Sequence, residues 1–465
     1  MLKSLLLSFS LLLPLQVSAD SSLNFGDDSM AMLPDGAVAS LMVADPVTGN
    51  TLYEHHADTL RPPASVLKLI AALAARLQLG ADFRFNTDIE MRDGDVIFRF
   101  GGDPSLRRDN IRKLVNKLKG ETSLIRGNIY LNGATFDSFE LADGLPWDNL
   151  GVCYSAPSSS ISLDDNCAVA KMVFTDNNRR KLGFEISRDA PIQIIDELEL
   201  TDGLEKRYCK FRLKADSTNQ YTLGGCLGRH KIPRFLNFAI QNTELYVADV
   251  ISRELKHAGI ELQGKIIRND RASGQIIGRE QSAALPELLD EMLKDSDNLI
   301  ADNLLKMIGH NYFDEAGGFD NGVTAVKAVL KEKAGIDLAN AALADGSGLS
   351  RNNRISASQV MAVLQYIHDH PELGLVEAMA QSGKSGTLRY RHSLYIDSLK
   401  GRVRGKTGTL YGTYNIAGIM NTAAGKPLLF VQMVTNYHHP DYHRHEKREI
   451  RAFERKFYKA IHAAK

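Results

Sequence analysis

The pattern of apolar and polar residues predicts two strands and then a buried helix in the first part of the chain. Residues 37–43 and 51–53 have the alternation or β-branching of strands, and a polar turn with proline and glycine separates them. Residues 66–79 are apolar almost all round and stop at Gly80, a residue type common just after a helix. Because a helix without a polar face is buried on most sides, we expect residues 66–79 inside the protein.

The pattern changes between residues 83 and 283. Residues 83–91 and 96–100 flank a charged turn that contains glycine, which predicts a hairpin. Further short strand-like runs occur at residues 125–131 and 211–214. This part of the chain therefore predicts one or two small, β-rich inserted domains.

Longer elements return after residue 284. Helical periodicity marks residues 285–293 and 299–308, and a final amphipathic helix is predicted at residues 444–462. Three strands linked by short turns are predicted between them, at residues 402–410, 414–420 and 428–435. We expect these three strands to join the two N-terminal ones in one antiparallel sheet packed against helices. The fold class is then α+β, and the domain that contains the sheet is discontinuous in sequence.

The first nineteen residues have the pattern of an export signal. Lys3 supplies a positive charge, residues 5–15 are mostly apolar, and residues 17–19 form a small-residue cleavage site, so cleavage is expected before Asp20. A membrane anchor is the alternative, but the apolar run is too short to span a bilayer comfortably. Since no later stretch reaches transmembrane length, the mature protein is expected to be soluble or at most peripherally attached to a membrane.

Composition and charge narrow the function classes. Of the 465 residues, 44% are apolar and 24% are charged, which is ordinary for a globular protein. Lysine plus arginine and aspartate plus glutamate number 56 each. Because nucleic-acid-binding domains have a clear basic excess, nucleic acid is not an expected partner.

The four cysteines fit an oxidising compartment. Three connectivities are open, and we favour the pairing of sequence neighbours, Cys153 with Cys167 and Cys209 with Cys226. Their spacing is too wide for a CxxC redox pair or a zinc knuckle. A histidine cluster at residues 438–445 is a second candidate metal site, but a solvated turn is the more common role of such a cluster. We therefore expect no metal.

Three short motifs carry candidate reactive side chains: SVLK at residues 65–68, SDN at 296–298 and KTG at 406–408. The first opens the predicted buried helix, where Ser65 and Lys68 share one face, so the lysine can reach the hydroxyl. A serine hydroxyl is a weak nucleophile until a base takes its proton. Burial and a helix N-terminus favour the neutral lysine that does so. The pair is therefore a candidate nucleophile and base.

Each motif alone has a simpler interpretation. A serine three places before a lysine occurs by chance in a chain of this length, SDN caps the following helix, and KTG marks an edge strand. In the functional interpretation, Ser296 and Asn298 project into a cleft. Lys406 and Thr407 then offer a cation and a hydroxyl to a substrate carboxylate, and Gly408 lets a ligand backbone approach closely.

Together the motifs resemble the signature of penicillin-binding proteins and serine β-lactamases. Ser65 and Ser296 lie 231 residues apart (296 − 65), more than a compact β-lactamase needs, and the excess matches the predicted insertion. The whole chain resembles the low-molecular-weight class C penicillin-binding proteins. This resemblance rests on residues 63–65 (PAS), 100–104 (FGGDP), 153–157 (CYSAP), 164–167 (DDNC), 294–298 (KDSDN), 345–351 (DGSGLSR) and 386–391 (GTLRYR).

The resemblance implies a transpeptidase domain of the penicillin-binding/β-lactamase-like type, which holds a second domain that itself holds a third. After a signal peptide at residues 1–19, the implied division is a catalytic domain at 20–82 and 284–465, domain II at 83–160 and 228–283, and a nested domain III at 161–227.

The resemblance also implies a serine-type D-alanyl-D-alanine carboxypeptidase and endopeptidase, which acts without a cofactor on peptidoglycan stem peptides in the periplasm and which β-lactams acylate. The implied catalytic residues are Ser65, Lys68, Ser296, Asn298 and Lys406. The implied substrate-binding residues are Thr407, Gly408, Thr409, Asp164 and Arg351. Of these, Asp164 holds the free amino group of diaminopimelate, Arg351 faces the substrate, and the backbone N–H groups of Ser65 and Thr409 form the oxyanion hole.

Alternative functions are a serine β-lactamase and a catalytically idle peptidoglycan-binding protein. A β-lactamase needs a base for deacylation, usually a glutamate in Glu-x-x-Leu-Asn, and the sequence has none, so penicillin is expected to inhibit. Three intact motifs argue against an idle protein. Two points stay open: Tyr411 stands where related proteins can carry glutamine, and the apolar stripe of residues 450–461 either touches a membrane or, as we favour, packs on the sheet.

Overall fold

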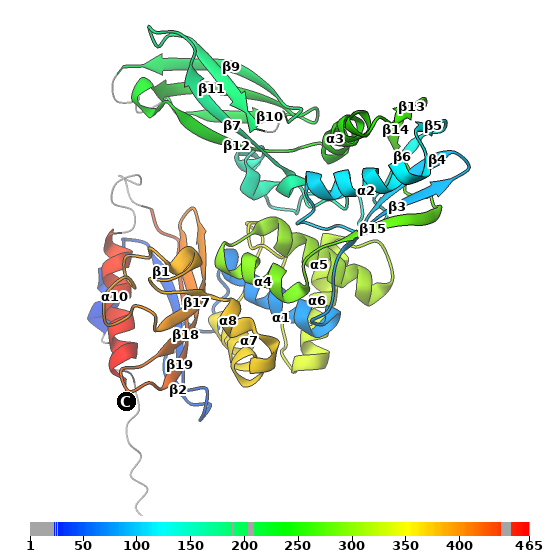
Figure 1. The fold of residues 1–465 in the computed structure, drawn as a ribbon. Coiled ribbons are helices and arrows are strands. Elements are labelled where there is room, and N and C mark those ends of the chain that lie inside the picture. The colour runs from blue at the N-terminus through cyan, green and yellow to red at the C-terminus, as the bar shows by residue number, and fades with distance from the viewer. Residues whose placement is uncertain are drawn as a thin grey trace, which may run out of the picture.

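The structure is a computed structural model that describes residues 23, 25, 27–187, 190–202, 209–438 and 448–464. The predicted signal peptide at residues 1–19 lies outside the described residues. Figure 1 shows a body of sheet and helices that carries a β-rich insertion. None of the described helices is both long enough and apolar enough to cross a membrane.

One antiparallel sheet forms the centre of the body. Its strands are β1 (Val38–Ala44), β2 (Thr51–His55), β16 (Ala380–Gln381), β17 (Val403–Leu410), β18 (Thr413–Asn421) and β19 (Pro427–Thr435). They lie in the order β16-β17-β18-β19-β1-β2, and Val38 pairs with Thr435 where the N-terminal and C-terminal parts join. The predicted joining of two N-terminal and three C-terminal strands is confirmed, and the pattern misses only the short edge strand β16.

Helices cover both faces of this sheet (Figure 1). The helices of the body are α1 (Lys68–Leu79), α4 (Leu285–Lys294), α5 (Asn298–Phe313), α6 (Phe319–Ala334), α7 (Ala357–Asp369), α8 (Leu375–Ala378) and α10 (Arg448–Ala463), with 3₁₀ turns η1 (Asp27–Met32), η2 (Ala64–Leu67), η8 (Pro371–Leu373) and η9 (Gly386–Leu388). The first turns of α1 are buried on every side, from Lys68 to Ala75, as expected of a helix without a polar face.

The last helix, α10, lies on the opposite face of the sheet from α1, where η1 packs against it (Figure 1). Its apolar side chains Ile450, Phe453, Phe457 and Ile461 are all 0% exposed and share one core with β18 and β19. The expected packing on the sheet is therefore confirmed. These four side chains are therefore not exposed for contact with a membrane.

The outer part of the insertion is a mixed five-stranded sheet in the order β14-β6-β4-β3-β15. Its elements are β3 (Asn86–Arg92), β4 (Asp95–Phe100), β6 (Ile129–Asn132), β14 (Ile266–Arg268), β15 (Gln275–Gln281), the short pair β5 (Leu124–Ile125) and β13 (Glu261–Leu262), and the helices α2 (Arg108–Glu121) and α3 (Thr243–Ala258). The predicted hairpin is β3–β4.

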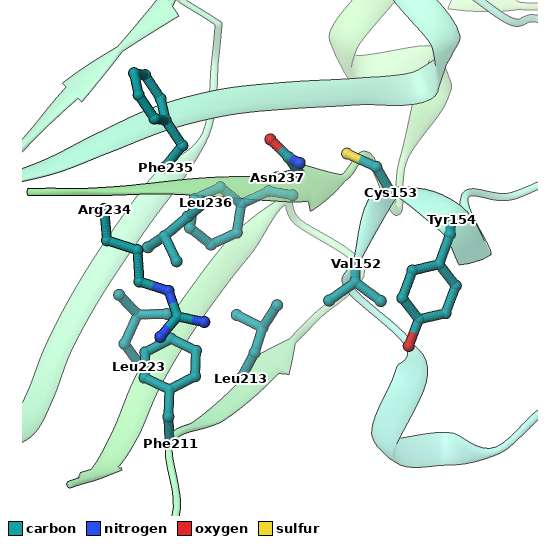
Figure 2. A pocket seen from close by; sticks show the side chains of 11 residues that line it. Val152, Cys153, Tyr154, Phe211, Leu213, Leu223, Arg234, Phe235, Leu236 and Asn237 are labelled. Carbon is teal, nitrogen blue, oxygen red and sulfur yellow. The ribbon is translucent and has the colours of Figure 1, made fainter. Parts of the chain in front are cut away.

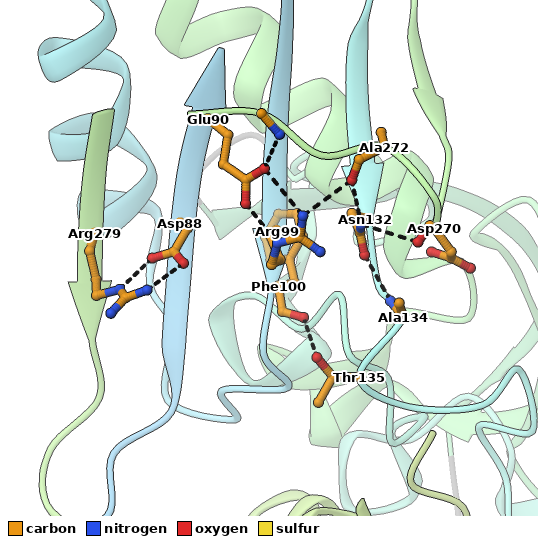
Figure 3. Close-up of polar contacts among 11 residues, drawn as sticks. Asp88, Glu90, Arg99, Phe100, Asn132, Ala134, Thr135, Asp270, Ala272 and Arg279 are labelled. Carbon is orange, nitrogen blue, oxygen red and sulfur yellow. Dashed lines mark hydrogen bonds and ion pairs between the residues drawn. The ribbon is translucent and has the colours of Figure 1, made fainter. Parts of the chain in front are cut away.

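Ion pairs join the strands of this outer sheet (Figure 3). Asp88 on β3 accepts two hydrogen bonds from Arg279 on β15, at 2.6 and 2.8 Å. Glu90, two residues further along β3, accepts two from Arg99 on β4, at 2.6 and 3.2 Å. Because alternate residues of a strand share one face, the two acids lie side by side and tie β3 to both of its neighbours.

The nested part of the insertion holds two three-stranded sheets, β10-β11-β9 and β12-β7-β8. Their strands are β7 (Cys167–Phe174), β8 (Leu182–Ile186), β9 (Gln193–Thr201), β10 (Arg212–Ala215), β11 (Gln220–Gly228) and β12 (Arg234–Ala239). The implied division assigns β12 to domain II, yet β12 pairs in register with β7. We therefore propose that domain III continues to Ala239, and that the other boundaries stay as first given.

Both disulfides join sequence neighbours, as predicted. Cys153 bonds to Cys167, and Cys209 bonds to Cys226. Glu199 lies beside the second pair, but sulfur atoms that are bonded to each other are not available as metal ligands.

Helix α5 anchors the insertion to the body. Lys306 is fully buried and donates hydrogen bonds to the carbonyl oxygens of Phe139 (2.6 Å) and Ser158 (3.0 Å). Asn303 donates to the carbonyl of Gly102 at 2.9 Å. The helix that begins with the SDN motif therefore also fixes the position of the insertion above the cleft.

Candidate active site

Residues of the first two motifs, and Thr409 directly after the third, line one cavity of about 760 Å³ between the body and the insertion. Ser65 comes from η2, Ser296 and Asn298 from the junction of α4 and α5, and Thr409 from β17. Tyr154, from the 3₁₀ turn η4 (Cys153–Ser155), lines it from the insertion. Segments that are distant in sequence thus face a common space, as the functional interpretation of the motifs requires.

The turn that carries Ser65 is held from several sides. Asn415 on β18 donates hydrogen bonds to the carbonyls of the two preceding prolines, at 2.9 and 3.0 Å. Ala64 has a φ of 49°, a left-handed conformation that needs such support. A Cβ on Gly408 would lie 2.7 Å from a proline carbonyl, and one on Gly348 would lie 1.9 Å from the Ala64 carbonyl. Both glycines are therefore required for the strand and the loop to approach the turn.

Lys68 is completely buried, and its amino group has three neighbours. Its Nζ lies 3.0 Å from Ser65 Oγ, 2.6 Å from Asn298 Oδ1 and 2.7 Å from the carbonyl oxygen of Ser347. Burial lowers the pKa of Lys68 to about 8, although nearby aspartates, first of all Asp302, act to raise it. A neutral fraction is therefore accessible near neutral pH, as a base for Ser65 requires.

The loop at residues 345–350 forms the wall behind Lys68. Asp302 on α5 accepts hydrogen bonds from the N–H groups of Gly346 (2.9 Å) and Ser347 (2.8 Å), which fixes the carbonyl that meets Lys68. Asp345 is almost fully buried and accepts from the N–H groups of Gly348 (2.8 Å) and Ser350 (2.6 Å). In the sequence, this loop was notable only for its resemblance to a family motif. The contact of the Ser347 carbonyl with Lys68 could not be predicted, because every residue type has a main-chain carbonyl.

The SDN motif both caps a helix and reaches the cleft. Asp297 accepts a 2.7 Å hydrogen bond from the N–H of Ile300, so the capping interpretation is correct for this one residue. Its two neighbours face the cavity instead. Ser296 has a φ of 67°, which turns the chain between α4 and α5 so that its hydroxyl meets Lys406.

Lys406 lies on β17, which pairs with β16 only at Arg404 and Gly405, so from Lys406 to Leu410 the strand has β18 on one side and an edge open in the described chain on the other, as the simpler interpretation expects. Its Nζ is buried and lies 2.8 Å from Ser296 Oγ. Burial and the like charge of Lys68 hold the pKa of Lys406 well below its usual range. Thr407 donates to the hydroxyl of Thr387 at 2.8 Å. Thr409 is exposed at the cavity.

The outer wall of the cavity contains residues of both charges. Asp148 is exposed and is the only carboxylate among the described residues that line the cavity. Arg351 lines the same cavity and donates a 3.1 Å hydrogen bond to the carbonyl of Tyr411. Both charges act on Tyr154. Burial raises the pKa of Tyr154, the negative charge of Asp148 raises it further, and the positive charge of Arg351 lowers it.

Asp164 does not take part in this cavity, and its expected position facing the substrate is wrong. Its side chain is 5% exposed, accepts hydrogen bonds from the Tyr246 hydroxyl (2.9 Å) and the Arg108 N–H (3.2 Å), and ties the 3₁₀ turn η5 (Asp164–Asn166) to α2 and α3. Asp148, in the 3₁₀ turn η3 (Trp147–Asn149), is the carboxylate of the insertion that lies at the cavity. None of the motifs considered in the sequence contains Asp148.

The histidine cluster is only partly within the described chain. His438 hydrogen-bonds to the hydroxyl of Tyr411 at 2.9 Å, while the other three histidines lie outside the described residues. Tyr411, the position of the expected departure from related proteins, lines the active-site cavity.

A smaller cavity of about 350 Å³ opens between the two nested sheets and shares Tyr154 with the active-site cavity (Figure 2). Its lining is mainly apolar, and the guanidinium of Arg234 stacks 5.0 Å from the centre of the Phe211 ring. Nothing in its lining offers an acid, base or nucleophile for catalysis beyond the tyrosine that both cavities share.

Comparisons with known proteins show the family to which this chain belongs. The chain matches the D-Ala-D-Ala carboxypeptidase 3 (S13) family over residues 27–457. It belongs to this family. It is 33% identical to the D-alanyl-D-alanine carboxypeptidase DacB of Haemophilus influenzae, with 99% of this chain and 98% of that protein covered. It is 26% identical to the D-alanyl-D-alanine carboxypeptidase of Actinomadura sp. (strain R39), with 89% and 81% covered.

Solved structures give the same result for the S13 fold. The crystal structure of penicillin-binding protein 4 from Haemophilus influenzae has a TM-score of 0.88 at 33% identity, and covers 94% of this chain and 98% of that one. The complex of the same protein with a β-lactam has a TM-score of 0.84. The predicted α+β fold and the resemblance to class C penicillin-binding proteins are confirmed, and the chain is a serine-type D-Ala-D-Ala carboxypeptidase.

Proposed function

We propose that this S13 carboxypeptidase uses Ser65 as nucleophile and Lys68 as base. The observation that carries the proposal is the 3.0 Å contact between Lys68 Nζ and Ser65 Oγ at the wall of the cavity. Neutral Lys68 takes the hydroxyl proton while Oγ attacks the carbonyl carbon of the penultimate D-alanine. The backbone N–H groups of Ser65 and Thr409 then stabilise the resulting oxyanion.

The second half of acylation uses the Ser296–Lys406 pair. Lys406 and Thr407 bind the terminal carboxylate of the peptide, and the hydroxyl of Ser296 delivers a proton to the leaving amine while it takes one from Lys406, 2.8 Å away. The C–N bond breaks, D-alanine leaves, and the peptide remains as an ester on Ser65. Water then attacks the ester and gives its proton to Lys406 through Ser296, while Lys68 returns its proton to Ser65 Oγ, which restores the free serine.

Ser65→Ala and Lys68→Gln test these assignments on a peptide that ends in D-alanyl-D-alanine. Loss of the activated nucleophile abolishes the ester and reduces D-alanine release by several orders of magnitude, as in other serine hydrolases. Mass spectrometry of the wild type with penicillin is expected to place the adduct on Ser65. Undiminished release of D-alanine by Ser65→Ala would refute the proposal and favour an idle binding protein with a contaminating activity.

We also propose that the protein is an endopeptidase for peptide cross-links. The same acyl transfer releases a cross-linked stem peptide when the leaving amine belongs to a second chain. The cavity, which is open between body and insertion, supports this because it leaves room for a bulky leaving group. Incubation with cross-linked muropeptides and with uncross-linked pentapeptides separates the two activities by product mass. If dimers stay intact while pentapeptides lose D-alanine, the protein is a carboxypeptidase alone.

We propose that Asp148 and Arg351 bind the polar groups of the stem peptide, in place of the role first given to Asp164. Opposite charges on one cavity wall suit a zwitterionic side chain with both an amino group and a carboxylate, such as that of diaminopimelate. Support comes from the exposure of Asp148 and from the position of Arg351, whose guanidinium is held by the Tyr411 carbonyl.

We propose that β-lactams acylate Ser65 and are released slowly. Apart from Asp148, no described residue that lines the cavity offers a carboxylate to activate water, so the ester has no dedicated base for hydrolysis. We further propose that the protein is exported to the periplasm after cleavage at residue 19. Two disulfides support an oxidising compartment. A periplasmic protein whose N-terminal residue is Asp20 is the expected result of N-terminal sequencing.

A further inference from the structure

A second cavity adjoins the active site at the end of β17. It has a volume of about 770 Å³ and shares Arg351 and Tyr411 with the active-site cavity. The hydrogen bond from the Arg351 guanidinium to the Tyr411 carbonyl forms the partition between the two. A ligand that fills the active site and extends past Tyr411 therefore reaches this second cavity, which we term the arginine cavity.

Three arginines line the arginine cavity: Arg61, Arg351 and Arg354. Its one acidic lining residue among the described residues is Asp35, and none of the three arginines forms an ion pair with a carboxylate of the described chain. Most arginines of a protein surface have acidic neighbours, so three unpaired guanidinium groups beside one cavity create a positive potential there. Such a site favours an anion, and a carboxylate above all fits the planar fork of arginine.

Two of these arginines are rigidly placed. The backbone of Arg61 is paired with that of Ile355 by hydrogen bonds of 2.9 and 3.0 Å, and its Nε donates to Ser40 Oγ at 3.1 Å. One nitrogen of Arg354 donates to the carbonyls of Arg351 and Asn353, both at 2.7 Å. Each arginine keeps further N–H groups for a ligand, because a guanidinium has five donors. The site is thus pre-organised rather than assembled from mobile surface chains.

The order of residues along β17 indicates which part of the substrate reaches the arginine cavity. This step rests on the proposed function. Thr407 meets the terminal carboxylate and the N–H of Thr409 meets the carbonyl that is attacked, so the bound peptide runs antiparallel to β17. Its residues that precede the scissile bond then continue past Leu410 toward Tyr411 and Gly412, which line the arginine cavity.

We infer that the arginine cavity binds a free carboxylate of the substrate peptide on the N-terminal side of the acylated residue, beyond the side chain held in the active site. The enzyme therefore discriminates among D-alanyl-D-alanine peptides by a negative charge that is remote from the reacting atoms. Remote binding energy of this kind raises kcat/KM without any change in the chemistry at Ser65.

The test uses two pentapeptides that end in D-alanyl-D-alanine and differ only in one group, a free carboxylate or a carboxamide on the second residue before the acylated one. The readout is the ratio of kcat/KM for the acid to kcat/KM for the amide. For the wild-type enzyme at low salt we expect a ratio of about tenfold or more, as for a hydrogen bond to a charged group. Arg61→Gln is expected to bring the ratio close to one, and Arg61→Lys to restore part of it.

Arg402→Gln is the matched control, since Arg402 sits at the opposite end of β17, where it donates to the Thr422 carbonyl. It is expected to keep the wild-type ratio. A wild-type ratio near one, or an unchanged ratio in Arg61→Gln, overturns the inference. If Arg61→Gln does not fold, the wild-type ratio and its decrease at high salt decide the question. Failure of the proposed function looks different, because then neither peptide is hydrolysed, or Ser65→Ala hydrolyses both.

Discussion

Asn298 joins Lys68 to the insertion. Its amide oxygen accepts a hydrogen bond from Lys68 Nζ at 2.6 Å, and its amide nitrogen donates to the carbonyl of Tyr154, also at 2.6 Å. One side chain therefore orients the proposed base and fixes a wall of the substrate cavity. The position of the insertion above the cleft and the reactivity of Ser65 are coupled through this amide.

Asn298→Ala is expected to reduce the rate of Ser65 acylation by penicillin about 10²-fold, the lower range for loss of a positioned base. Hydrogen exchange at residues 152–155 is expected to increase in the same variant, because the Tyr154 carbonyl loses its donor. Asn311→Ala, at the exposed far end of α5, is the control. Wild-type acylation by Asn298→Ala would show that Lys68 is oriented without it.

The buried position of Lys68 predicts a pH profile. Lys68 must be neutral to accept the proton of Ser65, and burial lowers its pKa to about 8. The rate of acylation by benzylpenicillin is therefore expected to rise with pH and to level off above about 8, rather than rise toward the ordinary lysine value of 10.5. A rapid-quench series across this range measures it. A rate that still increases tenfold per pH unit above 9 contradicts the assignment.

A substitution at Asp302 tests more directly whether Lys68 is the base. Its negative charge acts to raise the pKa of Lys68, and it also holds the N–H groups of Gly346 and Ser347. Asp302→Asn is expected to shift the acylation profile to lower pH and to lower its plateau about tenfold through disorder of the Ser347 carbonyl. Asp320→Asn, on the exposed side of α6, is the control. A lower plateau without a shift in the profile would leave Asp302 only a structural role.

Asp148 and Asp164 are two carboxylates of the insertion with opposite expected behaviour. Asp148→Asn is expected to raise KM about tenfold or more for peptides with a free side-chain amine, and to have little effect when that amine is acetylated. Asp164→Asn, the matched substitution, is expected to lower stability and to leave this amine preference unchanged, because its carboxylate bonds to Tyr246 and Arg108. The reverse result would restore the first assignment of Asp164.

A buried ion pair supports the sheet behind the active site. Arg391 and Glu454 are 6% and 0% exposed, and Glu454 also accepts hydrogen bonds from Ser393 and Gln432. Glu454→Leu leaves the Arg391 charge buried without a partner and is expected to cost about 3–5 kcal/mol of the free energy of unfolding. Lys331→Ala, which removes an exposed pair, is expected to leave the unfolding temperature unchanged in calorimetry.

Much of the fold and of the catalytic set follows from sequence pattern. Ser65, Ser296 and Asn298 line one cavity, and Lys68 and Lys406 lie behind it in contact with Ser65 and Ser296, because each motif sits at a fixed place on a regular element: a helix start, a helix junction and a strand. Local cysteine pairing was also predictable, since short loops close at low entropic cost.

The parts that sequence reasoning missed depend on contacts without a residue signature. The Ser347 carbonyl and its support by Asp302 arise from the path of a loop, and any residue has a carbonyl. Asp164 and Asp148 lie in the same insertion and belong to similar polar turns. Only the fold decides that Asp164 points into the core between α2 and α3 while Asp148 faces the cavity.

The pairing of β1 with β19 has a consequence for how the protein is made. Strand β1 cannot pair with β19 until almost the entire chain has been synthesised. Strands β3 to β15 lie closer together in the sequence and can assemble earlier. Non-local pairing of this kind is slow. A chain that stops before β17 has neither Lys406 nor the donor at Thr409, so by the proposed mechanism an unfinished molecule does not acylate. Reactivity therefore appears last, only in a completed polypeptide.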